Sequence, residues 1–325
     1  MTALSENLSE SPSSTETAET EEAAETKAAV ETQEATKTAG TAGTPGTAPA
    51  ESPQPATVLK VAGLHITDRA TDREIVHGVD FELTPGKAVG VVGESGSGKT
   101  LTCRAVLGIL PAHFEISEGA VEIAGTDIAT LTPQQWTRLR GATISAVFQD
   151  PASYLNPSIK VGAQIAEVVR AKNGLKRGPA RQRALELLRA VHLREPELVY
   201  GQYTYELSGG MLQRVLIAAA IAAGPRVLIA DEATTALDVT VQAEILDLLA
   251  DLRERTGLAL VVVSHDLAVV AQTCDEVLVM RQGEVVEHGP TRQVLHHPRH
   301  EYTRLLVAEH EQYGLDRFRT SKEAS

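Results

Sequence analysis

The chain has 325 residues, enough for one large or two modest domains. Its 43 acidic and 30 basic residues give a formal net charge of −13, which argues against nucleic acid as a partner. The two cysteines, Cys103 and Cys274, are too few and too far apart for a disulfide framework or a thiolate metal cage. No apolar run approaches the ~20 residues of a membrane-spanning helix. We therefore expect a protein that is soluble by itself, in a reducing cytoplasm.

Residues 1–57 differ in composition from the rest of the chain. They contain no aromatic residue and repeat Thr, Ala, Glu, Pro, Ser and Gly, so they cannot bury enough apolar surface to offset the entropy cost of ordering a backbone. They also lack the apolar stretch of a signal peptide and are acidic where a transit peptide would be basic. We predict a disordered acidic tail over 1–57.

A glycine-rich loop follows, between a predicted strand and a predicted helix. Lys87–Val92 is an apolar run of strand length, and Thr100–Leu110 has helical periodicity. Glycines between them let backbone N–H groups approach phosphate oxygens without intervening side chains, which indicates a phosphate-binding loop. Its predicted ATP-binding residues are Gly93, Glu94, Ser95, Gly96, Ser97, Gly98, Lys99 and Thr100. Lys99 would reach the terminal phosphates, and the Thr100 hydroxyl would ligate Mg²⁺.

A second phosphate-binding element lies at Leu207–Arg214, much further along the chain. Its Ser-Gly-Gly turn opens a predicted helix, and a helix N-terminus offers backbone N–H groups and the positive end of a dipole to a phosphate. We expect this element to act on the nucleotide of a neighbouring subunit.

Two further apolar runs end in polar residues suited to catalysis. Val227–Ala230 is followed by Asp231, which is placed to hold Mg²⁺, and by Glu232, which can polarise the attacking water as a general base. Leu258–Val263 is followed by His265, which can hydrogen-bond a γ-phosphate and the catalytic carboxylate. The carboxyl ends of parallel strands face a bound ligand, so these side chains are expected to meet at one site.

Taken together, these motifs resemble the ATP-binding subunit of ATP-binding-cassette (ABC) transporters over about residues 58–310. The resemblance also includes Gln149 in Val147–Pro151, and Asp238. It implies an α/β fold, an ABC-type P-loop NTPase cassette with a mostly parallel core sheet. An N-terminal antiparallel β portion would cover 58–84 and 119–124. The cassette would span 58–290, with a helical subdomain at about 150–215, and a C-terminal segment would follow over 291–325.

The resemblance also implies roles for residues and partners. Two cassettes would pair head to tail, bind ATP and Mg²⁺, and power solute import. Gln149 would contact Mg²⁺ and the attacking water, and Asp238 would communicate across the dimer. The residues serving the partner's ATP would be Ser208, Gly209, Gly210, Met211 and Gln213. Expected partners are a second, different cassette chain, two membrane permease subunits and, indirectly, a solute-binding protein, but no nucleic acid. The expected location is peripheral, on the cytoplasmic face of the plasma membrane.

Two features narrow the branch of this family. Met211 stands where Gln is usual, and His297–Leu306 looks like the His-Pro-Tyr-Thr segment of oligopeptide, dipeptide and nickel importers. One feature departs from the family. No aromatic residue lies in Leu64–Asp68, where the adenine-stacking residue is expected, so either His65 substitutes for it or adenine is held loosely.

The cargo is the least specified property. Leu101–Pro111, Gly210–Arg214 and Leu306–Leu315 resemble the first ATPase subunit of nickel importers, which favours nickel or a metal complex. The alternative is a di- or oligopeptide. A repair or ribosome-associated ABC ATPase is more remote, because the segment between Gln149 and Leu207 is short and lacks heptads, and each motif occurs once.

Overall fold

The computed structural model describes residues 57–235 and 237–313, with the backbone alone for 310–313. The predicted acidic tail lies outside the described residues except for Thr57, and so do Ala236 and 314–325. Among the described helices, none combines the length and the apolar character needed to cross a membrane.

The central element is a six-stranded sheet in the order β10-β9-β3-β8-β7-β6. Its strands are β3 (Ala88–Val92), β6 (Ile144–Val147), β7 (Val227–Asp231), β8 (Ala259–Ser264), β9 (Glu276–Arg281) and β10 (Glu284–Pro290). Neighbouring strands are parallel except for β9 and β10, which form an antiparallel pair at one edge. Strands β3, β7 and β8 are buried along their whole length, as expected for near-continuous apolar runs in a parallel sheet. The predicted mostly parallel core sheet is confirmed.

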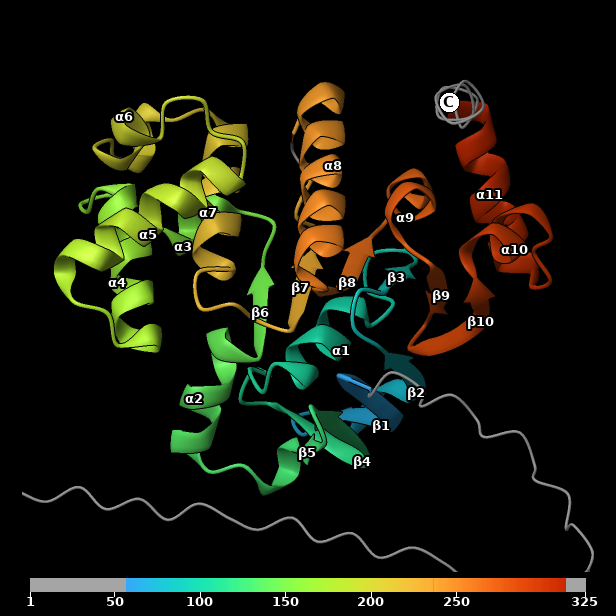
Figure 1. Cartoon of the computed structure of the whole chain (residues 1–325). Helices are drawn as coiled ribbons and strands as arrows, with labels where there is room; N and C mark the ends of the chain where they lie inside the picture. The colour runs from blue at the N-terminus through green and yellow to red at the C-terminus, as the bar shows by residue number, and fades with distance from the viewer. Residues whose placement is uncertain (1–56, 236, 314–325) are drawn as a thin grey trace, which may run out of the picture. The chain divides into compact units, whose positions relative to one another are not determined.

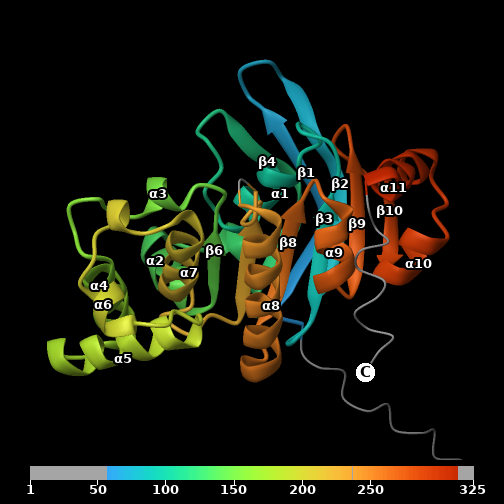
Figure 2. The same cartoon turned by 90° about the horizontal axis from the view of Figure 1, so that it is seen from above.

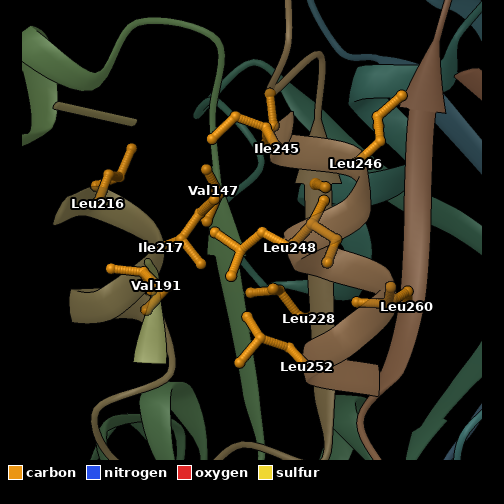
Figure 3. Packing of buried hydrophobic residues seen from close by; sticks show 14 of the residues in the cluster. Val147, Val191, Leu216, Ile217, Leu228, Ile245, Leu246, Leu248, Leu252 and Leu260 are labelled. Carbon is orange, nitrogen blue, oxygen red and sulfur yellow. The ribbon is translucent and has the colours of Figure 1, made fainter. Parts of the chain in front are cut away.

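Alternate side chains of the central strands enter two separate hydrophobic cores. Leu228 of β7 and Leu260 of β8 belong to the core that also contains Leu248 of helix α8 (Val239–Thr256). Figure 3 shows these three side chains together. Ile229, next to Leu228 in the chain, belongs to the other core, because successive side chains of a strand point to opposite faces. The sheet therefore needs cover on both faces.

The second core contains a four-stranded antiparallel sheet in the order β2-β1-β4-β5. Its strands are β1 (Leu59–Asp68), β2 (Arg73–Leu83), β4 (Phe114–Ile123) and β5 (Thr126–Asp127). Helix α1 (Lys99–Val106) packs against β1, β2 and β7, and lies across the central sheet from α8 and α9 (Leu267–Thr273) (Figure 2). The predicted antiparallel portion is confirmed. Strand β4 begins earlier than the predicted 119, because its pairing with β1 starts at Phe114.

A group of helices lies beside β6, at the edge of the central sheet opposite β10 (Figure 1). The helices from 128 to 220 are η1 (Ile128–Thr130), α2 (Pro133–Ala142), α3 (Pro151–Tyr154), α4 (Val161–Asn173), α5 (Arg177–Ala190), α6 (Pro196–Tyr200), η2 (Thr204–Glu206) and α7 (Gly209–Ala220). Helices α4, α5 and α7 contact one another, α6 contacts α4 and α5, and α7 also contacts β6. The helical periodicity over Val161–Ala190 is divided between two helices, because Gly174 adopts a left-handed φ of 67° and ends α4.

The described C-terminal region contains helices α10 (Thr291–His296) and α11 (Glu301–Tyr313). Both contact α9, and α10 also contacts β9 and β10. The described C-terminal region thereby packs beside β9, the strand that pairs with β3 ahead of the predicted phosphate loop.

Candidate functional site

The loop between β3 and α1, which is predicted to bind phosphate, contains glycines in unusual backbone conformations. Gly93 and Gly98 have φ values of 152° and 99°, which side-chain-bearing residues rarely adopt. A Cβ atom at Gly93 would lie 2.0 Å from the carbonyl oxygen of Met280, and one at Gly98 would lie 3.1 Å from Cγ2 of Val76. Glycine is therefore required here by both conformation and close approach.

Lys99 begins helix α1 and turns its ammonium group back into the loop. Its Nζ donates hydrogen bonds to the carbonyl oxygens of Gly93 and Glu94, each at 2.7 Å, and lies 3.5 Å from Oγ of Ser97. The residue is only 5% exposed, and this burial lowers the pKa of Lys99, opposed by the carboxylates of Glu232 and Asp231. The ammonium thus occupies the centre of the loop.

Two of the three predicted protein ligands of Mg²⁺, Thr100 and Asp231, lie side by side. Thr100 Oγ1 on α1 donates to Oδ1 of Asp231 at the end of β7, over 3.2 Å. Burial raises the pKa of Asp231, and the hydrogen bond from Thr100 opposes this shift. A hydroxyl and a carboxylate oxygen form a donor set that suits a hard cation such as Mg²⁺, so these residues fit the ion.

Glu232 and His265 come together at the ends of β7 and β8. Glu232 has a left-handed φ of 50°, and its N–H donates to the carbonyl oxygen of Val263 over 3.0 Å. This conformation is uncommon for a residue other than glycine. The Glu232 side chain is 25% exposed, and its Oε1 lies 3.8 Å from Nδ1 of the more exposed His265. The carboxylate is therefore accessible to water and next to an imidazole.

Gln149 lies two residues beyond β6 and is exposed. Val147 at the end of β6 pairs with Ala230 of β7, immediately before Asp231. Parallel strands end at the same edge of a sheet, so Gln149 comes after β6 at the edge where Asp231 ends β7. Asp150 then caps helix α3 by accepting from the Ala152 N–H.

The predicted signature forms the start of helix α7. Ser208 is the N-cap residue, and its Oγ accepts from the Met211 N–H over 3.4 Å. Ser208 and Gly209 are exposed, so this helix N-terminus is accessible. A Cβ atom on Gly210 would lie 2.6 Å from Cγ1 of Val241 on α8, which explains why glycine stands there. The signature is packed on α8, whereas the phosphate loop is packed on β9 and β2.

Asp238 caps the N-terminus of α8, the helix against which the signature packs. Its Oδ1 accepts from the Val241 N–H over 2.9 Å, and the residue is exposed. Val241 is the same residue that approaches Gly210. Asp238 therefore anchors the part of α8 that supports the signature.

Gln213 lies differently from the sequence-based expectation. Its side chain is 1% exposed on the inner side of α7, so it does not face a nucleotide outside this chain. Met211 is partly buried and packs against the larger hydrophobic core. Arg214 donates from Nη1 to the Val191 carbonyl oxygen and from Nη2 to Oε2 of Glu244. These residues pack or hold α7 against the rest of the chain, while Ser208 and Gly209 form its exposed end.

His65, the expected substitute for an adenine-stacking aromatic residue, is engaged by a carboxylate. Its Nδ1 contacts Oε1 of Glu74, whose Oε2 lies 3.2 Å from Nδ1 of His77. Hydrogen bonding to His65, and then to His77, lowers the pKa of Glu74. The imidazole is therefore held on the surface of the antiparallel sheet.

Two contacts with the phosphate loop were not predicted from the sequence. The Glu94 N–H donates to the Tyr302 hydroxyl of α11 over 2.9 Å, and the Gly283 N–H donates to the Ser97 carbonyl oxygen over 3.2 Å. The His-Pro-Tyr-Thr resemblance marked the segment containing Tyr302, but it did not indicate where this side chain lies. Only the tertiary structure joins positions so distant in the chain.

Comparisons with known proteins identify the family of the chain. A family model described as "ABC transporter" matches residues 76–235. The dipeptide transport ATP-binding protein of Lactococcus lactis is 41% identical over 249 residues, which cover 76% of this chain and 71% of that protein. The chain belongs to the ABC transporter family. Within it, the chain is an ATP-binding subunit of the peptide-importer type.

Two further comparisons concern cargo and fold. The metal-staphylopine import system ATP-binding protein of Staphylococcus aureus is 38% identical over 252 residues, covering 78% of this chain and 93% of that protein. A dimeric ATP-binding cassette solved in a post-hydrolysis state with ADP and Pi is 28% identical, with a TM-score of 0.64. That match covers 72% of this chain and 99% of the other. The fold is that of ABC ATPase cassettes, and the chain is an ATPase of this family.

Proposed function

We propose that this chain powers the import of di- or oligopeptides through a membrane permease. The observation that carries the proposal is the 41% identity to a dipeptide transport ATP-binding protein over most of both chains. This relative supports peptide as the cargo. The three short stretches discussed in the sequence analysis had instead favoured nickel or a metal complex. The resemblance of those stretches is too local to outweigh identity over 249 residues.

A metal complex remains a second candidate because of one observation. The relative named for metal-staphylopine import is matched over 93% of its length. The name of that relative joins the metal to staphylopine. A metal complex is therefore a closer competitor to peptide than the free nickel ion is.

The chemistry of the proposed hydrolysis follows from the side chains at the strand ends. Lys99 would exchange its carbonyl partners for phosphate oxygens, and the Glu232 carboxylate would accept the proton of the attacking water. His265, beside Glu232, would contact the γ-phosphate. Thr100 and Asp231, with Gln149, would hold Mg²⁺, which would screen the phosphate charges when bound.

The exposed end of α7 supports a dimer in which each cassette completes the other's site. Ser208, Gly209 and Gly210 would offer N–H groups to the partner's ATP, and Asp238 would lie near the same interface. The solved cassette with ADP and Pi is itself dimeric. We propose a second, different cassette chain as the partner. The helices of about 150–215 would face two permease subunits. The chain would then be a peripheral protein on the cytoplasmic face of the plasma membrane.

Uptake measurements test the cargo directly. Cells lacking this chain, complemented with the parental gene or with Lys99→Ala, are supplied with labelled dipeptide, oligopeptide, nickel or a nickel chelate. We expect peptide uptake to require the chain and an intact Lys99, while nickel uptake is unchanged. Loss of uptake of nickel or its chelate alone would overturn the peptide proposal. Unchanged uptake of all four would reject the import role for these cargoes.

A further inference from the structure

The C-terminal helix α11 begins at a set of hydrogen bonds that fixes its position. The Glu287 carboxylate on β10 accepts from the N–H groups of Arg299 and His300, at 2.9 and 3.0 Å. The His300 Nδ1 accepts from the Tyr302 N–H over 3.2 Å. This region lies beyond residues 76–235, which the family model matches. The residues just before α11 are therefore hydrogen-bonded to the Glu287 carboxylate on β10 of the central sheet.

Tyr302 leads from this helix to the phosphate loop. The residue is 2% exposed, and the Arg281 guanidinium lies over its ring, 4.9 Å from the centroid. Its hydroxyl accepts from the Glu94 N–H over 2.9 Å. Burial raises the pKa of Tyr302, which keeps the phenol neutral. The buried Tyr302 side chain thus places its hydroxyl group against the backbone of the phosphate loop.

The peptide group between Gly93 and Glu94 is held at both of its polar atoms. Its N–H donates to Tyr302, and its carbonyl oxygen, that of Gly93, accepts from the Lys99 ammonium over 2.7 Å. A peptide group is planar, so fixing its N–H also fixes the direction of its carbonyl oxygen. Tyr302 therefore sets the orientation of a group that positions the catalytic lysine.

The opposite part of the loop has a second support from the same region of the chain. The Gly283 N–H, in the turn after β9, donates to the Ser97 carbonyl oxygen over 3.2 Å. The Met280 carbonyl oxygen closely approaches Gly93. Arg281, which covers the Tyr302 ring, lies between these two residues in the chain. The turn and α11 together hold the loop from one side.

We propose that Tyr302 is a positioning residue for ATP binding, through which the C-terminal helix holds the phosphate loop ready for the triphosphate. Without the hydroxyl, the Gly93–Glu94 peptide group keeps the contact of its carbonyl oxygen with Lys99 but loses the acceptor of its N–H, so ATP must order it further on binding. The affinity for MgATP then falls while the chemical step is preserved. This role concerns nucleotide binding and does not depend on which cargo is imported.

The test compares Tyr302→Phe with Tyr200→Phe in the full chain. Both changes delete one hydroxyl from a tyrosine with an arginine over its ring, since Arg181 lies 5.0 Å from the Tyr200 centroid. We expect Tyr302→Phe to raise the Kd for MgATP by roughly threefold to tenfold, the range expected for one hydrogen bond. The melting temperature without nucleotide and kcat should remain near the parental values, and Tyr200→Phe should leave the Kd unchanged.

Hydrogen exchange supplies an independent readout of the loop itself. In the nucleotide-free protein, the peptide covering residues 91–98 should exchange faster in Tyr302→Phe than in the parent, and saturating MgATP should reduce the difference. An unchanged Kd with unchanged exchange would overturn the proposal. A lowered melting temperature with faster exchange throughout α11, but not in 91–98, would also overturn it, because it would show a structural role alone.

Discussion

Asp231 illustrates the cost of placing a charge in a buried site. The residue is 5% exposed, and burial raises its pKa above the ordinary value of 3.8. The folded state therefore binds the proton more tightly than the unfolded chain does. Between the two pKa values, stability falls as the pH rises, and at neutral pH the ionised carboxylate destabilises the fold. The Mg²⁺-binding role that we propose for Asp231 would therefore be opposed to the stability of the fold.

The Asp231→Asn variant should therefore be more stable than the parent without nucleotide. The amide keeps the shape and removes the buried charge, so we expect the free energy of unfolding to rise by about 1 kcal/mol at neutral pH. The gain should shrink as the pH falls from the raised pKa of folded Asp231 towards the ordinary aspartate value, and it should vanish below that value, where the folded and unfolded states are both protonated. Denaturant unfolding across pH measures this, with the more exposed Glu232→Gln as control. A less stable Asp231→Asn would contradict the assigned cause.

Glu232 carries the prediction for hydrolysis. Gln at this position keeps the size of the side chain but cannot accept the proton, so ATP hydrolysis should fall by about 100-fold or more. ATP binding should persist, and the ATP-bound dimer with the partner cassette should accumulate. ATPase assays and light scattering with both cassette chains measure the two effects. Hydrolysis at the parental rate would show that another group is the base.

At the scale of elements, the start of α7 depends on its approach to α8. Gly210→Ala would place a Cβ atom 2.6 Å from Cγ1 of Val241, whereas Gly209→Ala would place one 3.7 Å from Cδ2 of Leu237. Val241 is β-branched and in a helix, so it has little rotamer freedom to yield. We expect Gly210→Ala to lose about 1–3 kcal/mol of stability and Gly209→Ala to lose little.

The added substitution Val241→Ala should recover much of the stability lost in Gly210→Ala, because it removes the clashing methyl group. Thermal and denaturant unfolding of the single and double variants provide the comparison. Equal losses for Gly209→Ala and Gly210→Ala would show that helix contact does not explain the glycine.

Elements with a local signal were predicted well from the sequence. The strand, loop and helix around Lys99 follow from glycine spacing and short-range periodicity, although α1 ends at Val106 rather than near Leu110. Strands β9 and β10 were not predicted as elements, and neither was the end of α4 at Gly174 within the predicted helical subdomain. The burial of Gln213 could not be predicted from a motif, because it depends on the face of α7 that meets the core.

At the scale of the whole molecule, Asp275 joins segments that are distant in sequence. Its Oδ2 accepts from the Ala88 N–H at 2.9 Å and from Arg253 Nη1 at 3.1 Å, and its carbonyl oxygen accepts from the Thr291 N–H. Strand β3, helix α8 and helix α10 thus meet at one residue. Such a junction, like that of Tyr302 with Glu94, cannot be predicted from the sequence because no local pattern links residues so far apart in the chain.

The Asp275→Ala variant should lose about 2–3 kcal/mol of stability, because the Ala88 N–H and the Arg253 guanidinium are left without this acceptor. Asp275→Asn retains an oxygen acceptor and should lose about 1 kcal/mol. Denaturant unfolding measures both. Equal losses for the two variants would mean that the charge on Asp275, rather than its acceptor role, dominates.

The hydrogen bonds of the Lys99 ammonium to the carbonyl oxygens of its own loop also have a consequence for product release. When ADP and phosphate depart, the ammonium can return to the oxygens of Gly93 and Glu94. Product release therefore need not leave a buried cation without acceptors, a state that would strongly oppose release. In the proposed role, the loop that binds the triphosphate would also supply the acceptors that replace its products, which would favour repeated turnover over retention.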